Sequence, residues 1–462
     1  MSQQNFKNKK VVIIGLGRYE HGSGSMAVQY FSKHKAEVVV TDKNTAQNLS
    51  ETLTRLKDCE NVTYLLGNDR DTALITDADF VFQNPAVPDT HPLIIQANKK
   101  KIPVINDWSL FFMHKRANCV GVTGTRGKTT TTSLLFAMVQ TKYPKAYLAG
   151  NIGVSPLTFL GQYKGELVVA EFSSWLLRGL RAVKKSPYVA VFTNLMLDHQ
   201  NMYPSMKAYG NDKKLIFEYQ NKKGVVILNT SNPYTKKIAT SLKKKRKVLV
   251  MGEKLLGFKN GIVIDKGLRI FEKGVERFGI PASDITLKGE HNLYNAAGAS
   301  LAAATLGISW NTIARVLKTF TGVPYRMEKI AEKNTITYIN DTTATTPDAT
   351  IAALTALRDK KVTLICGGAD KELEYQTWAN VVSQYATNTV IIPGNASDKM
   401  KKELDKKEYH YTTAETLQQA LQKAEKITKK EGIILLSPSA ASFNMFKNEF
   451  DRGDQFNALV RG

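Results

Sequence analysis

The segment GVTGTRGKTTTTSLLF, residues 121–136, constrains the fold more than any other stretch of the chain. It has the pattern of a buried strand end, a glycine-rich turn and the start of a helix. Gly124 and Gly127 lie in the turn, and Lys128 comes where the helix begins. A strand that leads directly into a helix is typical of the βα units that build parallel sheets.

The same alternation runs through the rest of the 462 residues. Short apolar runs such as KVVIIGLG, AEVVVTD, KGVVILN, KVTLICGGADK and GIILLSPSAAS are separated by helical patterns. A strand-rich stretch with turn signals interrupts this order near residues 247–274. The pattern predicts an α/β protein with three domains in series, over residues 1–115, 116–322 and 323–462.

Composition narrows the classes of protein. No apolar run is long enough for a transmembrane helix, and the N-terminus lacks the pattern of a secretion signal. The three cysteines, Cys59, Cys119 and Cys366, match neither a zinc spacing nor a disulfide framework, so we expect a cytoplasmic protein. The net charge of +23 suits either a polyanionic partner or a lysine-rich solvated surface. Because no nucleic-acid motif accompanies the lysines, we expect neither nucleic acid nor membrane as a partner.

The glycine turn has the layout of a phosphate cradle. Backbone N–H groups and the helix N-terminus would face phosphates, Lys128 would contact their oxygens, and the Thr129 hydroxyl would reach Mg²⁺. The strict pattern GxxxxGK[ST] fails, because Val122 stands where its first glycine belongs. The alternative is a glycine-rich turn without a ligand. The residues predicted to bind nucleotide here are Gly124, Thr125, Arg126, Gly127, Lys128, Thr129 and Thr130.

A second glycine turn, GLGRYEHGSGS, follows the first strand. It resembles the dinucleotide fingerprint, with Asp42 at the end of the next strand as the candidate ribose ligand. Glu20 occupies the place of the third glycine. A nucleotide-like ligand, NAD, or tight packing alone are the three interpretations. The candidate ligand-binding residues are Gly15, Gly17, Arg18 and Asp42.

Further polar residues follow predicted strands or begin predicted helices. Open parallel sheets bind ligands at the carboxyl ends of their strands, so these residues are candidates for one site. For the histidine a buried structural role is the alternative, and Asn292 could serve only as a helix cap. The residues are Glu171, Asp198, His199, Asn292, Asn295, Arg326, Asp341, Lys371 and Ser442.

The order of these segments resembles one enzyme family. TGTRGKTTT, EFSSW, LDHQNMYPSMKAY, GEHNLYNAAGA, GVPYRMEKI, NDTTATTPDATIAAL, GGADK and LSPSAASFNMFKNEFDRGDQF together are similar to the Mur ligases of peptidoglycan synthesis. The resemblance spans nearly the whole chain. It implies an N-terminal Rossmann-like domain that binds a UDP substrate, a central P-loop ATPase domain with a mostly parallel sheet, and a C-terminal Rossmann-like domain that binds the amino acid.

The resemblance also implies a reaction, which is ATP-dependent amide formation through an acyl phosphate with two Mg²⁺ ions. It is closest to members that add D-glutamate to UDP-N-acetylmuramoyl-L-alanine, and it implies a monomer. It assigns catalysis to Lys128, His199 and Lys213, and metal binding to Thr129, Glu171, His199 and carbamoylated Lys213. It adds Asn292, Asn295, Arg326 and Asp341 to the ATP site, and Asn151 and Ser173 to the UDP-substrate site. The amino acid would contact Lys371, Ser442, Phe443 and Phe450.

Several positions depart from the family pattern. Arg126 replaces an asparagine in the phosphate loop, Thr342 and Thr343 replace a Ser-Lys pair, and Glu449 and Phe450 stand in inverted order. Lys214, beside Lys213, is the alternative carbamate. L-glutamate or another acidic amino acid therefore stays an alternative substrate. A glutamate ligase similar to folylpolyglutamate synthase is the other alternative, although about 115 residues precede the phosphate loop here.

Overall fold

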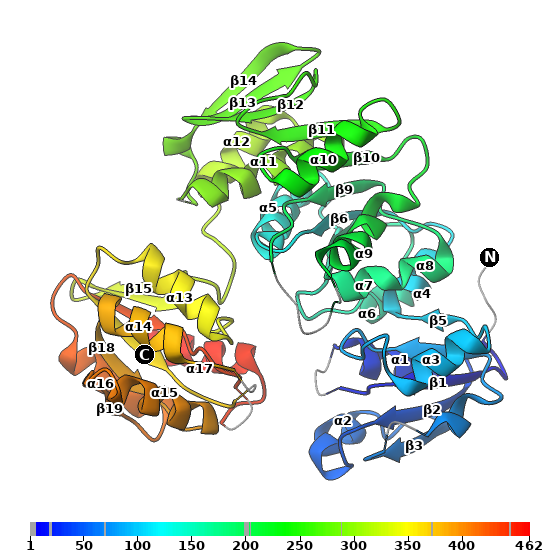
Figure 1. The fold of residues 1–462 in the computed structure, drawn as a ribbon, viewed down its shortest axis with the longest axis horizontal. Helices are drawn as coiled ribbons and strands as arrows, with labels where there is room; N and C mark the ends of the chain where they lie inside the picture. The colour runs from blue at the N-terminus through cyan, green and yellow to red at the C-terminus, as the bar shows by residue number, and fades with distance from the viewer. Residues whose placement is uncertain are drawn as a thin grey trace. The chain divides into compact units, whose positions relative to one another are not determined.

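The structure is a computed structural model that describes residues 6–17, 21–68, 71–197, 203, 205–287, 289–370, 373–442 and 445–462. It contains three sheets with helices on their faces (Figure 1). The chain divides into two compact units, Met1–Phe320 with the first two sheets and Thr321–Gly462 with the third. The predicted α/β fold with three Rossmann-like or P-loop-like sheets is confirmed. The domain limits given above stay a prediction.

The first sheet has five parallel strands in the order β3-β2-β1-β4-β5. This is the order of a dinucleotide-binding Rossmann fold, in which the chain reverses direction beside β1. Val11 and Ile13 face one buried layer and Val12 and Ile14 face the other, so both sides of β1 are covered. The elements are β1 (Lys10–Ile14), α1 (Ser23–Lys33), β2 (Glu37–Asp42), η1 (Gln47–Leu49), α2 (Ser50–Arg55), β3 (Val62–Leu66), η2 (Thr72–Ile75), β4 (Phe80–Gln83), α3 (Pro92–Lys99), β5 (Val104–Ile105) and α4 (Asp107–Met113).

The second sheet has nine strands in the order β14-β13-β12-β11-β10-β9-β6-β8-β7. It is parallel from β7 to β12, and β12, β13 and β14 form an antiparallel edge. The strands are β6 (Cys119–Thr123), β7 (Tyr147–Gly150), β8 (Val168–Glu171), β9 (Val189–Phe192), β10 (Val225–Asn229), β11 (Lys247–Gly252), β12 (Gly261–Ile264), β13 (Gly267–Glu272) and β14 (Val275–Pro281).

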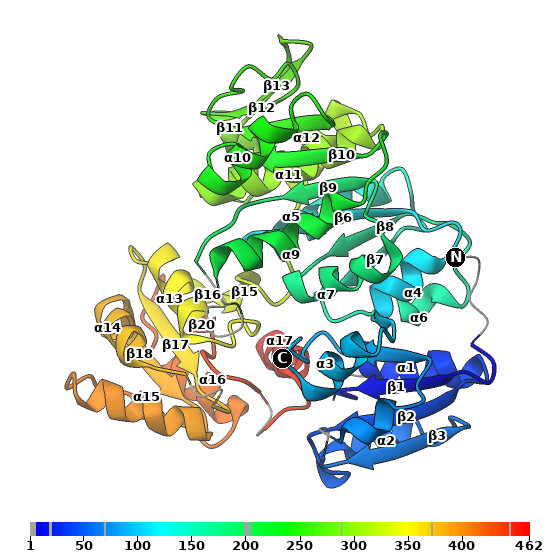
Figure 2. The same ribbon diagram turned by 45° about the vertical axis from the view of Figure 1, so that its right-hand side comes forward.

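Helices cover both faces of this second sheet (Figure 2). The core that contains Val120 and Val122 of β6 is closed by α5, α11 and α12, whereas α7 and α9 close the opposite face. The helices are α5 (Lys128–Gln140), α6 (Leu157–Leu160), α7 (Ser174–Arg178), α8 (Leu180–Val183), α9 (Met206–Glu218), α10 (Pro233–Leu242), η3 (Ala282–Asp284), α11 (Glu290–Thr305) and α12 (Trp310–Thr319).

The third sheet has six strands in the order β15-β16-β20-β17-β18-β19, of which only the β15–β16 pair is antiparallel. Residues of α13, α14 and α15 fill one core layer, and residues of α16 and α17 fill the other. The elements are β15 (Glu328–Lys333), β16 (Ile336–Asn340), α13 (Pro347–Ala356), β17 (Val362–Cys366), α14 (Gln376–Tyr385), β18 (Ala386–Ile391), α15 (Asn395–Asp405), β19 (Thr412–Thr413), α16 (Leu417–Ile427), β20 (Ile433–Leu436) and α17 (Glu449–Arg461). Across the described segments, no helix combines the length and apolar character needed to cross a membrane.

Candidate active site

The glycine loop between β6 and α5 requires its two glycines. Gly124 has φ +155° and Gly127 has φ +78°, both in the region that favours glycine. A Cβ atom on Gly124 would collide with Thr193 Oγ1, and one on Gly127 would collide with Asn295 Oδ1. The backbone of the loop can therefore approach β9 and α11 closely only because neither residue has a side chain.

The end of β9 holds the loop in place. Asn194 accepts a hydrogen bond from Thr125 N through its carbonyl (2.9 Å) and one from Arg126 N through Oδ1 (2.9 Å). Thr193 Oγ1 donates to Arg126 O at 2.7 Å. These contacts fix the loop before any ligand binds, as a preformed phosphate site requires.

Helix α5 begins at the loop with Lys128, and Gly127 caps it without a side-chain hydrogen bond. The first N–H groups of a helix lack partners inside the helix and carry partial positive charge, so this N-terminus favours an anion. The Lys128 ammonium donates to Thr125 O at 2.9 Å and thus lies across the loop. Thr129 and Thr130 are half-buried in the first turn.

Glu171 ends β8, the strand next to β6, and is fully buried. Its Oε1 accepts from Asn151 Nδ2 at 2.9 Å, whereas Oε2 has no hydrogen-bond partner among the described residues. A buried carboxylate oxygen without a donor is costly unless a cation or donor binds it. The Glu171 carboxylate and the threonine hydroxyls are hard oxygen donors, which fit Mg²⁺. The described residues contain no group of three or more acidic, histidine or cysteine side chains that could hold a metal by themselves.

Lys213 lies on α9 and is 1% exposed. Its ammonium donates to Gly124 O at 2.7 Å and lies 4.7 Å from the centroid of the Tyr209 ring. Tyr209 in turn places its hydroxyl 3.4 Å from Thr125 Oγ1. The neighbouring Lys214 is only half-buried. Burial against the phosphate loop therefore favours Lys213 over Lys214 as a residue of the site.

Helix α11 contributes two asparagines to the same place. Thr131 Oγ1 donates to Asn295 Oδ1 at 3.3 Å, and Asn295 Nδ2 donates to Asn292 Oδ1 at 3.0 Å. Asn295 is buried, and its Oδ1 lies directly at Gly127. The structure thus brings the predicted Asn292 and Asn295 to the loop, although Thr131 and Asn295 are 164 residues apart in the sequence.

The loop after β1 is held by Asp42. The Oδ2 atom of this buried carboxylate accepts from Leu16 N at 2.8 Å and from Gly17 N at 3.3 Å. Asn84 Nδ2 donates to Gly15 O at 3.0 Å from the neighbouring strand end. Asp42 therefore shapes the loop, and a direct contact with a ribose stays a prediction.

Ser173 and Asn151 are the other residues predicted for this substrate. Ser173 caps α7, where its Oγ accepts from Leu176 N at 3.2 Å. Asn151 is exposed and holds Glu171 through the hydrogen bond given above. Arg18 and His199, as well as Asp198, lie outside the described residues.

In the second unit, Asp341 follows β16 and is buried. Its oxygens accept from Met327 N at 3.1 Å and from Ser437 Oγ at 2.8 Å. Burial raises the pKa of Asp341 to about 6, and the nearby exposed Arg326 partly opposes this rise. The predicted pair of Arg326 and Asp341 therefore lies together in the structure.

The predicted amino-acid site is described only in part, because Lys371 and Phe443 lie outside the described residues. Ser442 is buried, and its hydroxyl has no partner within the described part of the chain. The Phe450 ring makes an edge contact with the Tyr325 ring, with centroids 5.7 Å apart. A buried hydroxyl without a partner is an available hydrogen-bonding group for a ligand.

Several residues that position the predicted site residues were not themselves predicted from the sequence. Thr193 and Asn194 grip the phosphate loop, yet a threonine and an asparagine after a strand are common in turns. Arg452, fully buried on α17, donates to Thr342 Oγ1 at 3.0 Å, to Thr342 O at 2.9 Å and to Ala440 O at 3.3 Å. Burial lowers the pKa of this guanidinium to about 10. An arginine within an amphipathic helix gave no sequence signal for such a contact.

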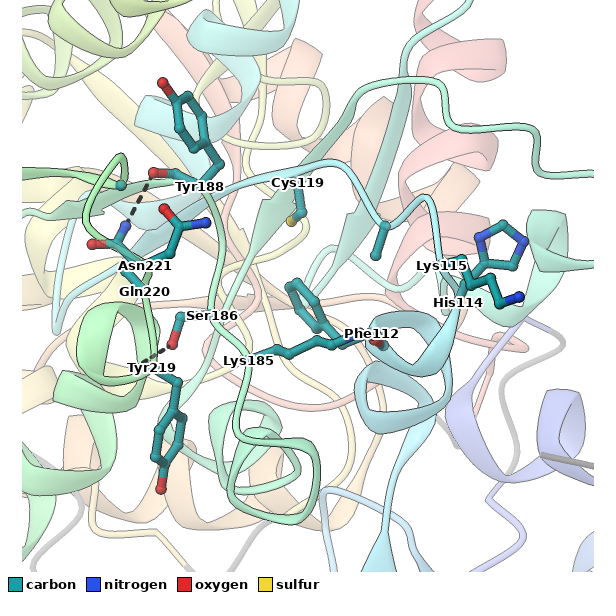
Figure 3. A pocket seen from close by; sticks show the side chains of 12 residues that line it. Phe112, His114, Lys115, Cys119, Lys185, Ser186, Tyr188, Tyr219, Gln220 and Asn221 are labelled. Carbon is teal, nitrogen blue, oxygen red and sulfur yellow. Dashed lines mark hydrogen bonds between the residues drawn. The ribbon is translucent and has the colours of Figure 1, made fainter. Parts of the chain in front are cut away.

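One cavity, of about 360 Å³, lies elsewhere (Figure 3). It is lined by residues near the starts of β6, β9 and β10, such as Cys119, Tyr188 and Gly224. The phosphate loop follows the opposite, carboxyl end of β6. This cavity is therefore not part of the candidate site.

Comparison with known proteins agrees with this geometry. Family models match three consecutive segments: the Mur ligase MurD-like N-terminal domain at residues 9–106, the Mur ligase middle domain at 122–303, and the Mur ligase glutamate ligase domain at 325–440. Two relatives named UDP-N-acetylmuramoylalanine--D-glutamate ligase are each 32% identical. The one from Roseiflexus sp. (strain RS-1) aligns over 98% of this chain and 98% of its own, and the one from Borreliella afzelii (strain PKo) over 100% and 99%.

Solved structures share the fold at low identity. The UDP-N-acetylmuramate-alanine ligase MurC from Thermotoga maritima has a TM-score of 0.58 at 17% identity, over 98% of this chain and 99% of its own. MurF from Acinetobacter baumannii also has a TM-score of 0.58, at 15% identity, over 97% and 93%.

Fold and loop together define a phosphate-loop α/β protein with Rossmann-like sheets before and after its central sheet. With full-length relatives at 32% identity and family models along the chain, the particular group follows: the chain belongs to the Mur ligase family.

Proposed function

We propose that this protein is an ATP-dependent ligase that joins D-glutamate to UDP-N-acetylmuramoyl-L-alanine through an amide bond. The observation that carries the proposal is the phosphate loop together with the groups around it. Lys128 Nζ and Lys213 Nζ both donate to carbonyls of the loop, and the buried Glu171 Oε2 has no donor among the described residues. The full-length relatives carry the name of this reaction.

The proposed reaction has two steps. The carboxylate of the UDP substrate attacks the γ-phosphorus of ATP and forms an acyl phosphate, and ADP leaves. The amine of D-glutamate then attacks the acyl carbon, the tetrahedral intermediate loses inorganic phosphate, and the amine loses a proton. Phosphoryl transfer of this kind depends mainly on positioning and on neutralising charge.

The chain's own residues would position ATP. Lys128 and the N-terminus of α5 would bind the β- and γ-phosphates, with the loop residues 124–130 around them. Asn292 and Asn295 border the loop, and we propose Arg326 and Asp341 for the nucleoside side of ATP. Mg²⁺, when bound, neutralises phosphate charge, and Thr129, Glu171, His199 and Lys213 are the ligands that we propose for two ions.

Lys213 could become a ligand only after modification, because an ammonium repels a cation. We propose that its neutral amine attacks CO₂, which forms a carbamate and releases a proton to solvent. The step needs the neutral amine, because an ammonium has no lone pair with which to attack CO₂. The product is an anion on a long side chain that points at the phosphate loop.

The remaining contacts are assigned by region. We propose that Gly15, Gly17, Arg18, Asp42, Asn151 and Ser173 form the site of the UDP substrate. We propose that Lys371, Ser442, Phe443 and Phe450 form the site of D-glutamate. A monomeric state and a cytoplasmic location complete the proposal. The location is supported by the use of ATP and by the unpaired thiols, which both suit the cytoplasm.

The test is phosphate release from ATP with UDP-N-acetylmuramoyl-L-alanine and a panel of amino acids. D-glutamate should give the highest kcat/KM, and Lys128→Ala should remove ligation while circular dichroism stays unchanged. Faster turnover of L-glutamate or another acidic amino acid would transfer the assignment to that substrate, and turnover of a folate acceptor alone would overturn it.

A second experiment addresses Lys213. Lys213→Ala should be inactive, and formate or acetate should restore part of the activity by occupying the place of the carbamate. Full activity of this variant together with an inactive Lys214→Ala would move the role to Lys214.

A further inference from the structure

A cluster of charged side chains surrounds a buried carboxylate of α9, outside the residues assigned above. Its centre is Asp212, which is 4% exposed. Asp212 Oδ2 accepts from Arg178 Nε at 2.8 Å and from Tyr203 OH at 2.9 Å, and Oδ1 accepts from Arg181 Nη2. Both carboxylate oxygens therefore have charged or hydroxyl donors.

The cluster joins three helices of the first unit and a residue of the segment that precedes α9. Asp212 belongs to α9, Arg178 ends α7, Arg181 lies in α8, and Tyr203 lies between β9 and α9. These three helices are neighbours in the structure (Figure 1). The Arg178 guanidinium also lies 5.2 Å from the centroid of the Tyr203 ring, so the tyrosine is held through both its ring and its hydroxyl.

The connected segments carry or adjoin three of the four proposed metal ligands, namely Lys213, His199 and Glu171. Lys213 directly follows Asp212 on α9, and Tyr203 comes four residues after His199. Glu171 precedes α7, where Arg178 is located. Asp212 thus ties α9, which carries Lys213, to α7, the helix that follows Glu171.

This cluster of hydrogen bonds fixes the position of α9 relative to α7 and α8. Two arginines and a tyrosine converge on one buried carboxylate, so α9 cannot rotate or slide without breaking several charge-assisted hydrogen bonds. Groups that orient metal ligands from behind commonly control metal affinity and activity. Errors of about 1 Å in such positioning can lower rates by about a hundredfold.

We propose that Asp212 is the positioning residue that holds α9 and Tyr203 in the arrangement in which Lys213 is carbamoylated. This inference rests on the function proposed above. The Lys213 carbamate forms reversibly from CO₂. The fraction of Lys213 that is carbamoylated therefore depends on how well the surrounding groups are positioned to stabilise the carbamate.

Two variants separate position from charge. Asp212→Asn keeps the side-chain volume but removes the carboxylate that both arginines share. Tyr203→Phe removes one hydrogen bond to Asp212 and changes no charge. Asp89→Asn is the matched control, because Asp89 lies outside α9, in the segment after β4, and pairs with the same two arginines, at 3.0 Å from Arg178 and 3.9 Å from Arg181.

The readouts are the lysine carbamate signal in ¹³C NMR with labelled bicarbonate, and the bicarbonate concentration for half-maximal ligation. Lys213→Ala gives the NMR background. Asp212→Asn should raise the half-maximal bicarbonate concentration about tenfold, and Tyr203→Phe about threefold. The KM for ATP should change less than about twofold in both, and Asp89→Asn should change neither readout by more than about twofold.

A general loss of folding is separated by thermal unfolding, with all assays run well below the unfolding temperature. If Asp212→Asn does not fold, Tyr203→Phe decides alone. Unchanged or increased carbamate occupancy in the folded variants would overturn the role of Asp212 and leave the proposed function intact. Absence of the signal in the unaltered protein would overturn the carbamate and this inference together.

Discussion

Ser442 shows how a single side chain can serve a ligand instead of the fold. Its buried hydroxyl has no partner among the described residues, and such a group costs about 1–3 kcal/mol of stability. Ser439, three residues earlier, is equally buried but donates to Thr350 Oγ1 at 2.7 Å. The two serines therefore allow a matched comparison.

We predict that Ser442→Ala raises the KM for D-glutamate about tenfold to a hundredfold, as expected for the loss of a hydrogen bond to a carboxylate. The melting temperature should stay the same or rise, since an unsatisfied polar group is removed. Ser439→Ala should lower the melting temperature and leave this KM unchanged. Steady-state kinetics and thermal unfolding check both, and an unchanged KM in Ser442→Ala would remove this serine from the site.

The raised pKa of Asp341 should make the free energy of unfolding depend on pH. Burial raises its folded-state pKa to about 6, above its usual value of 3.8. The folded protein therefore binds more protons than the unfolded chain between these two pH values, and its free energy of unfolding falls as the pH rises through this window.

The expected contribution of Asp341 to this fall is about 3 kcal/mol. Asp341→Asn cannot titrate, so it should gain stability relative to the unaltered protein between pH 4 and pH 7. Urea unfolding of both proteins at the two pH values measures the change, and other titrating groups cancel in the comparison. A constant difference between the two proteins would mean that the Asp341 pKa is not raised.

At the scale of elements, the junction of β6 and α5 depends on Gly127. A side chain there would require a left-handed backbone and would displace Asn295 of α11. We predict that Gly127→Ala weakens ATP binding at least tenfold and lowers stability by about 1–3 kcal/mol.

Gly279, in β14, is the control for Gly127. A Cβ atom there meets no atom within 4 Å, so Gly279→Ala should change neither property. Calorimetric titration with ATP and thermal unfolding provide the measurements. Normal ATP affinity in Gly127→Ala would show that the loop does not need its close approach to α11.

Elements were more predictable than the contacts between them. The strands β1, β6 and β17 are continuous apolar runs that end at glycines, so both their type and their ends could be read from the sequence. The phosphate loop was predictable for the same reason, because its chemistry is local. The family resemblance assigned Asn295 and Lys213 to the site, but their contacts with Gly127 and Gly124 were not predicted, since periodicity does not encode long-range contacts.

The contacts that hold the site could not be predicted from the sequence, even where the residue itself was a candidate. Asp42 was expected to meet a ribose, and the structure shows its carboxylate on the backbone of the β1–α1 loop. Arg452 and Asp212 are residue types common on surfaces, and their burial follows only from the packing of distant segments. Asn194 is half-buried, and its contact with the phosphate loop likewise depends on the fold. Their roles could not be derived before the fold was known.

The whole molecule is strongly basic, with a net charge of +23. The charge is uneven, because residues 236–277 contain thirteen lysine and arginine residues and only four acidic ones. Most of these basic side chains are exposed on α10, β11 and the antiparallel edge of the second sheet. ATP, the UDP substrate and glutamate are all anions, so this field should raise their local concentration.

The resulting prediction concerns ionic strength. Surface potentials are screened over about 10 Å at 0.1 M salt and over about 3 Å at 1 M. The KM for the UDP substrate should therefore rise about threefold to tenfold from low to high NaCl, while kcat changes little, because the buried contacts at the phosphate loop are screened far less.

Lys237, Lys244 and Lys245 are exposed, so replacing all three with Glu alters the field without disturbing the core. Each replacement removes one positive charge and adds one negative charge, so the three together lower the net charge from +23 to +17. This triple variant should show a higher KM at low salt and a weaker dependence on NaCl, and the two proteins should converge at high salt, where the field is screened in both. Sucrose at matched osmolarity controls for water activity. Equal salt dependence in the two proteins would assign the effect to local contacts in the site and leave the basic surface without a part in substrate binding.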